Sequence, residues 1–474
     1  MTRDLFNYLF PSVVQAALGL LVLVPVMTYY LDPRDFGVAA ILSAVAMPIG
    51  PLSSTGFSWV LSAHFYKLTE VEQRVLVFNV LLGEVVLRVF WVSVFALCAP
   101  LMLPVIVSGY EAEYLSYFYL VLATALVGGL WPAISYTVVL RQRSSHHAML
   151  ELLPWLASAI TTVVCLGVLR LSTVTLFVSP LIAGLTSLII SIRYAWHETI
   201  AQLSRRWLRE IVRMGIPSIP ANLLELLGGV SSRYFIQRWA GLGTLGIYSH
   251  SESYRSMLTM GVKAFSRTFS PSMLQAVTRD SELTNAKTML RWWYGLLALG
   301  GVSMGLFVGD IIGLLTHGKF VAAAPLAIVW FCLVISYSFG LPYSSFLSVH
   351  QKNAFMVNSG TLISGVFIGV VAVATYAFGP VGAALAVMLS NVAVQVVRRW
   401  YACAIGCERI GETGALAVLV STIGAYAIGG GLALSLATRL GIFVVSAIAI
   451  TALTRMRRSP GPTAGEAPSA IERA

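Results

Sequence analysis

The stretch YSHSESYRSMLTMGVKAFSR, residues 248–267, places Glu252, Arg255, Lys263 and Arg267 in otherwise membrane-like sequence. A charged side chain at the centre of a bilayer costs at least ~2.5 kcal/mol. Either this stretch is not a membrane span, or its charges face something other than lipid. The choice between these two readings decides the fold class.

Composition favours a membrane protein. The chain is 57% hydrophobic and only 11% charged, whereas a soluble domain is typically about 25% charged. An isolated segment in lipid satisfies its own backbone hydrogen bonds only as a helix. We therefore predict an all-α, polytopic membrane protein with about 14 transmembrane helices, at 5–30, 36–61, 76–103, 114–140, 147–169, 172–192, 214–237, 244–274, 292–316, 320–347, 354–378, 380–402, 413–435 and 438–454.

The basic residues predict orientation and not a nucleic-acid partner. The net charge is +11, but 21 of the 31 Lys and Arg residues fall in alternate connections and termini. Five fall in the opposite connections and five within spans. Because Lys and Arg accumulate on cytoplasmic loops, we expect both termini to be cytoplasmic.

The two halves of the chain resemble each other. FPSVVQAALGLL (10–21) parallels IPSIPANLLELL (216–227), and DFGVAA (35–40) parallels TLGIYS (244–249). These matches keep a near-constant offset, so we infer a parallel repeat of six plus six spans and a transporter with its substrate between two lobes. We expect Gly37 and Gly246, which match in this repeat, to meet at the outer gate.

The repeat sets the expected domain boundaries. The segment LSRRWLREIVRM (203–214) separates the halves and has the pattern of a basic, amphipathic helix at the membrane surface. We predict a six-helix lobe at 1–200, a cytoplasmic linker at 201–213, a second six-helix lobe at 214–410, two additional helices at 411–456 and a disordered cytoplasmic tail at 457–474.

The charges of the opening stretch share one face of the predicted helix. With Glu252 at zero, Lys263 lies at roughly +20°, Arg267 at roughly +60° and Arg255 at roughly −60° on a helical wheel. Ser256 and Thr259 fall in the same arc. The alternative is local neutralisation of Glu252 by Arg255, but this leaves Lys263 unexplained. We expect the stripe to face a water-filled path.

Other charged residues of the predicted spans are candidates to line the same water-filled path. Arg233 is a second cavity candidate, with Glu225 two turns before it, whereas Glu84 and Arg88 have the spacing of a structural ion pair. The net positive charge of the stripe favours an anionic substrate, and arginine suits phosphate in particular. The five cysteines have no His or carboxylate cluster around them, so we predict neither a metal site nor a cofactor.

Several motifs carry a family resemblance. GIPSIPANLLELL (215–227), SSRYFI (231–236) and LGTLGIYSHSESY (242–254) resemble the start of the second half of bacterial polysaccharide flippases, the Wzx-like branch of the MOP superfamily. LDPRDFGVAAI (31–41), IIGLLTHGKFVAAAPLAIV (311–329) and FGPVGAALAVMLSN (378–391) resemble other landmarks of that family.

The resemblance implies two six-helix lobes in a V, a central cavity lined by spans one, two, seven and eight, and a location in the bacterial inner membrane. It implies alternating access for a polyprenyl-pyrophosphate-linked oligosaccharide, an exopolysaccharide, capsule or O-antigen repeat unit. Membrane lipids are expected partners, and other polysaccharide-assembly proteins are left open.

By position, Arg233 matches the arginine of the family's Asp-Arg pair. Ser232 stands here in place of the aspartate. This departure leaves Glu225 and Glu252 as the candidates for coupling to a proton or sodium ion. The candidate substrate-binding residues are Arg255, Lys263, Arg267, Arg233, Ser256 and Thr259.

Two other function classes compete with this interpretation. A cation-coupled multidrug exporter of the same superfamily should have an acidic cavity, which the basic stripe argues against. A membrane polysaccharide polymerase or ligase should have a large external loop, and the predicted outer connections are short.

Overall fold

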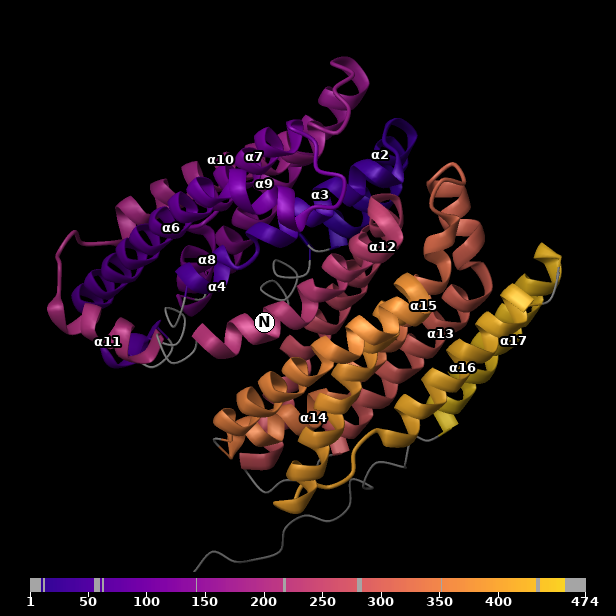
Figure 1. Cartoon of the computed structure of the whole chain (residues 1–474). Helices are drawn as coiled ribbons and strands as arrows, with labels where there is room; N and C mark the ends of the chain where they lie inside the picture. The colour runs from indigo at the N-terminus through magenta and orange to yellow at the C-terminus, as the bar shows by residue number, and fades with distance from the viewer. Residues whose placement is uncertain are drawn as a thin grey trace, which may run out of the picture.

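The computed structural model describes residues 10–11, 13–54, 60–61, 64–141, 143–215, 219–278, 284–350, 352–431 and 435–456. Regular structure in these residues is helical throughout (Figure 1). Its elements are η1 (Gly19–Leu23), α2 (Val24–Tyr30), α3 (Pro33–Ala46), α4 (Ile49–Ser53), η2 (Phe65–Lys67), α6 (Glu70–Ile106), α7 (Glu113–Val127), α8 (Trp131–Leu140), α9 (Ser144–Val163), η3 (Val164–Val168), α10 (Thr175–Glu198), α11 (Arg205–Gly215), α12 (Ile219–Thr278), α13 (Thr284–Leu315), η5 (Val321–Ala323), α14 (Ala324–Val349), α15 (Asn353–Ala404), α16 (Glu412–Gly431) and α17 (Leu436–Met456).

These helices confirm the predicted all-α, multi-pass fold. Ten helical segments of the described chain are long and apolar enough to cross a membrane. Counting the two arms of α15 separately, and adding the two arms of α12 and the shorter α17, gives the fourteen predicted spans. The predicted tail at 457–474 lies outside the described residues.

Two of the long helices are hairpins. Gly241 interrupts α12 at φ 84°, and Gly379 interrupts α15 at φ 61° just before Pro380. Arg233 contacts Glu252, 19 residues further along α12, at hydrogen-bonding distance. A straight helix would separate such residues by about 28 Å, so the chain must reverse. Glycine permits the positive φ that this reversal requires.

The helices form two groups that meet at one end. In Figure 1 the first group (indigo to magenta) and the second (pink to yellow) approach each other where α3 meets α12, and diverge toward the end at which α11 lies. One apolar cluster joins the groups at the closed end, with Leu42 and Phe118 from the first and Tyr248 and Trp330 from the second. This is the expected V of two lobes.

Gly37 and Gly246 lie at a close backbone contact between the lobes. A Cβ at Gly37 would lie 1.9 Å from the carbonyl oxygen of Leu242, and one at Gly246 would lie 1.6 Å from that of Pro33. Only glycine allows backbones to approach this closely. The predicted meeting of the two matched glycines is confirmed, and any larger residue would separate the lobes here.

The predicted span at 114–140 is broken between α7 and α8, and Arg88 of α6 occupies the break. Arg88 forms the predicted ion pair with Glu84 at 3.0 Å, and its Nη1 donates to the carbonyl of Ala125 at 2.9 Å. That carbonyl would otherwise accept from Gly129 in a continuous helix. A Cβ at Gly129 would lie 2.1 Å from Arg88 Nε. Arg88 therefore has a structural role.

The amphipathic linker is the helix α11. Its Trp207 and Ile211 are buried against Leu76 and Ile134 of the first lobe. Leu203 and Val212 are exposed and remain available to lipid. The two largest apolar contacts of the linker are therefore with protein, and its contact with the membrane surface stays a prediction.

Candidate functional site

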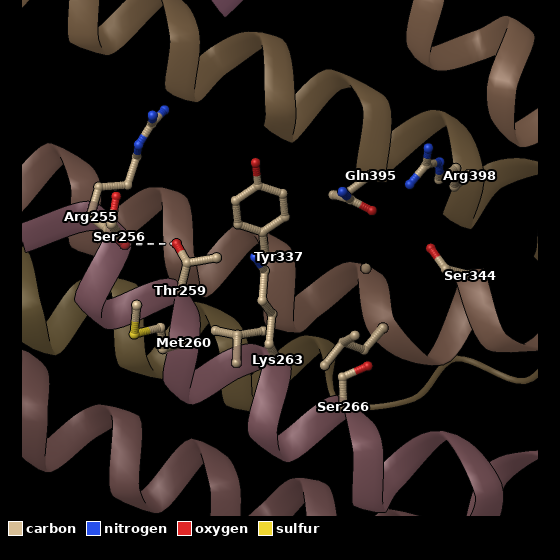
Figure 2. Close-up of a pocket in the computed structure, with 13 residues that line it drawn as sticks. Arg255, Ser256, Thr259, Met260, Lys263, Ser266, Tyr337, Ser344, Gln395 and Arg398 are labelled. Atoms are coloured by element: carbon tan, nitrogen blue, oxygen red, sulfur yellow. Dashed lines mark hydrogen bonds between the residues drawn. The ribbon is translucent and has the colours of Figure 1, made fainter. Parts of the chain in front are cut away.

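The second lobe contains a cavity of about 720 Å³ between α12, α14 and the second arm of α15 (Figure 2). Four of the predicted binding residues line it, Arg255, Ser256, Thr259 and Lys263. The remaining lining residues are Met260, Val262, Ser266, Tyr337, Gly340, Leu341, Ser344, Gln395 and Arg398. The charged stretch of α12 therefore faces this cavity.

Three cations face this cavity, Arg255, Lys263 and Arg398, and its described lining includes no aspartate or glutamate. The lining also includes the hydroxyl groups of Tyr337 and Ser344 and the amide of Gln395 (Figure 2). Such a wall offers charged and neutral donors to one ligand. Its chemistry suits an anion with several oxygen atoms.

Lys263 is the cation whose charge is least compensated. Its side chain is exposed, and the ion pairs of the described residues do not include it. In Figure 2 it extends from α12 toward Tyr337 on the facing helix. A lysine held in this way at membrane depth is a functional candidate, because a structural role would supply it with a carboxylate.

Arg255 is held in place on two sides. Its Nη2 lies 3.0 Å from Glu252 Oε1, and its Cζ lies 4.9 Å from the ring centroid of the buried Trp330. The indole Nε1 of Trp330 donates to Ser251 Oγ at 2.9 Å, which fixes the ring. These contacts position the guanidinium group at the cavity wall.

Glu252 lies behind this wall and is shared by two arginines. Its Oε2 accepts from Arg233 Nε at 2.9 Å and lies 2.8 Å from Arg233 Nη2. The side chains of Glu252, Arg233 and Arg255 are 8%, 14% and 30% exposed. The predicted neutralisation of Arg255 is therefore present, but the group as a whole keeps one net positive charge.

Ser256 and Thr259 line the cavity, but their hydroxyl groups already donate hydrogen bonds to backbone carbonyls. Ser256 Oγ donates to the carbonyl of Glu252 at 3.0 Å, and Thr259 Oγ1 donates to that of Arg255 at 2.7 Å. In this arrangement the two hydroxyls present lone pairs to the cavity. They would have to rotate to donate to an anion.

Sequence reasoning missed Gln395 and Arg398. Arg398 was counted with the cytoplasmic basic residues, although the predicted span 380–402 includes it. It lies on α15, donates to the carbonyl of Met356 at 3.1 Å and lines the cavity. Gln395 comes close to the backbone at Gly340, where a Cβ would lie 1.8 Å from its Oε1. Gln395 and Arg398 are three residues apart and so share one face of their helix, and this spacing could have identified them as a polar pair facing a cavity.

The remaining candidates lie away from this cavity or outside the described residues. The cavity described here lies within the second lobe, and the central cavity expected between spans one, two, seven and eight stays a prediction. Arg233 is held by Glu252 and is not among the lining residues. The side chains of Glu225 and Arg267 lie outside the described part of the structure.

The closed end of the V is clamped by polar contacts between the lobes. Lys319, between α13 and α14, lies 2.9 Å from Asp32 Oδ1 of the first lobe. Gln237 of α12 donates to the carbonyl of Ile106 at 2.5 Å and accepts from the backbone of Ser108 at 3.3 Å. These clamps flank the contact of Gly37 with Gly246, so this end is shut in the present conformation.

Two helical lobes that meet at one end, with a charged cavity in one of them, define a multi-pass membrane protein of the transporter type. Residues 26–292 match the model of the family described as "Polysaccharide biosynthesis protein". This match covers more than half of the chain, so the protein belongs to that family, as the sequence motifs predicted. No curated protein sequence matches the chain significantly.

Solved structures share the fold. The chain is similar to the lipid II flippase MurJ in an inward closed conformation, at a TM-score of 0.65 and 11% identity, with 96% of this chain and 98% of that chain covered. It is also similar to an inward-facing multidrug resistance MATE family transporter of the MOP superfamily, at a TM-score of 0.60 and 11% identity, with 84% and 97% covered.

A third similar structure is a MOP superfamily transporter from Pyrococcus furiosus that is described as having a binding pocket of reverse polarity. The TM-score is 0.54 and the identity 13%, with 85% of this chain and 95% of that chain covered. At these identities the three likenesses establish the fold alone.

Proposed function

We propose that this protein flips a polyprenyl-pyrophosphate-linked oligosaccharide across the bacterial inner membrane by alternating access. Membership of the polysaccharide biosynthesis family supports the biosynthetic context. The fold shared with a lipid II flippase supports movement of a lipid-linked sugar. The observation that carries the proposal is the cavity wall with Arg255, Lys263 and Arg398 and no carboxylate among its described residues.

The pyrophosphate is the part of this substrate that such a wall would bind. Its oxygens accept hydrogen bonds from guanidinium and ammonium groups, and these charge-assisted bonds are about twice as strong as neutral ones. Hydroxyls and the amide of Gln395 would contact the adjoining sugar. The polyprenyl chain would remain in lipid, which is as apolar as the chain itself.

The proposed orientation places both termini and the connection 193–213 in the cytoplasm. The uneven distribution of Lys and Arg supports it. In that orientation the end clamped by Lys319 and Gln237 is the outer end. The present conformation would then be closed to the outside, with the lobes diverging toward the cytoplasm, where lipid-linked precursors are assembled.

A multidrug exporter of the same superfamily is the second candidate, because MATE transporters share the fold. Such an exporter carries cationic drugs and should present acidic groups to them. The cavity described here has the opposite charge. A polymerase or ligase is less well supported, since the structural neighbours are transporters and a flippase.

Flipping in proteoliposomes tests the proposal. Purified protein is reconstituted with a fluorescent polyprenyl-pyrophosphate oligosaccharide, and the fraction exposed outside is followed with a membrane-impermeant quencher. We expect protein-dependent exposure of this lipid and no transport of a cationic dye. Transport of the dye with no exposure of the lipid would favour the exporter.

A further inference from the structure

A second cavity, of about 610 Å³, lies on the other side of the second lobe, between α13, α16 and α17. It shares no lining residue with the cavity between α12, α14 and α15. Figure 1 shows these three helices side by side at the edge of the lobe away from the first lobe. Of the three, α16 and α17 lie outside the internal repeat, so this cavity is not part of the repeated architecture.

One end of this cavity is basic. Lys287 and Arg291 lie one turn apart on α13, and Arg409 lies just before α16. Lys287 is neutralised by Glu408 at 2.7 Å. Another carboxylate of the described residues, that of Glu412, accepts from Arg399 at 2.6 and 3.0 Å.

The described lining of this cavity includes no aspartate or glutamate. The formal charges of the described side chains at this end, Lys287, Arg291, Arg409 and Glu408, sum to a positive value.

The rest of the cavity is suited to hydrocarbon. Its apolar lining residues include Leu290, Ala298, Val418 and Ile450. Its shape depends on glycines, because a Cβ at Gly414 would lie 2.7 Å from the ring of Tyr294. The ring can therefore lie flat against α16 and form one wall. A cavity between transmembrane helices that has a basic end and an apolar lining matches the anionic headgroup and the acyl chains of a phospholipid.

We propose that this cavity is a binding site for an anionic glycerophospholipid of the surrounding membrane. The phosphate binds at Arg291 and Arg409, and one acyl chain lies along Leu290, Val418 and Ile450. The lipid holds α16 and α17 against α13. Charge complementarity favours this occupant over a zwitterionic lipid, because an adjacent choline or ethanolamine group would bring a cation to the same basic end.

The test measures the thermal stability of the delipidated, full-length protein in detergent after addition of phosphatidylglycerol or phosphatidylcholine. A ligand that binds the folded state raises the unfolding midpoint in proportion to its occupancy. We expect phosphatidylglycerol to raise the midpoint and phosphatidylcholine to have little effect. The double variant Arg291→Gln/Arg409→Gln should weaken the response to phosphatidylglycerol by at least about tenfold in lipid concentration.

The matched control removes two exposed cations elsewhere, Arg193→Gln/Lys352→Gln, and should respond as the wild type does. If the double variant is unstable without lipid, Ile450→Trp provides the second test. It fills the apolar part of the cavity, leaves the basic end intact, and should also abolish the response.

Three results would overturn the proposal. One is an undiminished response in both the double variant and Ile450→Trp. The second is an equal response to inorganic phosphate, which would mean an anion site without a lipid. The third is competition of polyprenyl phosphate with phosphatidylglycerol at equal concentration, which would assign the cavity to the transported lipid. Flipping activity enters none of these readouts, so failure here leaves the proposed function untouched.

Discussion

Arg233 and Glu252 pair across the α12 hairpin, with Arg233 Nη2 2.8 Å from Glu252 Oε2. The same carboxylate holds Arg255 through its other oxygen. One buried acid therefore links the first arm of the hairpin to the wall of the cationic cavity. Any change in its charge acts on two arginines at once.

Glu252→Gln should destabilise the protein. Removing one partner of a buried ion pair costs about 3–5 kcal/mol, because the remaining charges are left uncompensated. Glu111→Gln is a control that breaks an exposed pair with Arg34, where a loss of about 0–1 kcal/mol is expected. The unfolding midpoints of the two variants in detergent give the comparison. Equal unfolding midpoints in the two variants would show that the Glu252 carboxylate contributes little to the stability of the protein.

The same variant tests whether Glu252 couples transport to a proton. A glutamine mimics the protonated acid, so a coupled transporter should still bind substrate but flip it slowly and without dependence on a pH gradient. A purely structural carboxylate predicts reduced stability with pH-gradient dependence unchanged in the surviving protein. Binding and flipping measured on the same preparation separate the two roles.

Gly246→Ala should open the clamped end. The new methyl group would meet the carbonyl oxygen of Pro33 at 1.6 Å, so the lobes must separate. Gly243→Ala is the matched control, since nothing lies within 4 Å of its Cβ position. Spin labels at Glu111 and Ala322, both exposed, report the distance between the lobes. An unchanged distance distribution in Gly246→Ala would contradict this role.

The orientation can be tested by labelling cysteines in a variant without the five native ones. Ala201→Cys, in the connection before α11, should be protected from an impermeant reagent applied outside intact cells. Ala322→Cys, near the clamped end, should react. Both positions are exposed on the protein, so reactivity depends only on the side of the membrane. Reaction at residue 201 with protection at 322 would reverse the topology.

Arg398→Gln should slow flipping about tenfold, because one charge-assisted bond to phosphate is lost. Arg193→Gln, an exposed change at the end of α10, is the control for charge removal. Arg398→Lys should recover part of the rate, since the charge remains but the forked donor does not. Wild-type flipping in Arg398→Gln would remove this residue from the site.

Much of the fold was predictable from the sequence. The apolar runs fix the helices because lipid leaves a spanning segment no other way to satisfy its backbone. The repeat also predicted the contact of Gly37 with Gly246. The break between α7 and α8 was not predictable, because it depends on Arg88 reaching a carbonyl on another helix.

The site was predictable only in part. Angles on a single helix identified Arg255 and Lys263, since both lie on one arc of α12. They could not pair Arg233 with Glu252, because that contact requires the reversal at Gly241. Arg398 lies inside the predicted span 380–402, but it was missed because only the packing of α15 against α12 and α14 brings it to the cavity.

Flipping by Lys263→Ala is the most direct test of the cationic cavity. The matched control is Lys352→Ala, which removes an exposed lysine from the connection between α14 and α15. Both proteins should fold and insert normally. We predict that Lys263→Ala loses at least about tenfold in the flipping rate of the lipid-linked oligosaccharide, while Lys352→Ala matches the wild type. A Lys263→Ala protein that flips this lipid at the wild-type rate would contradict the account.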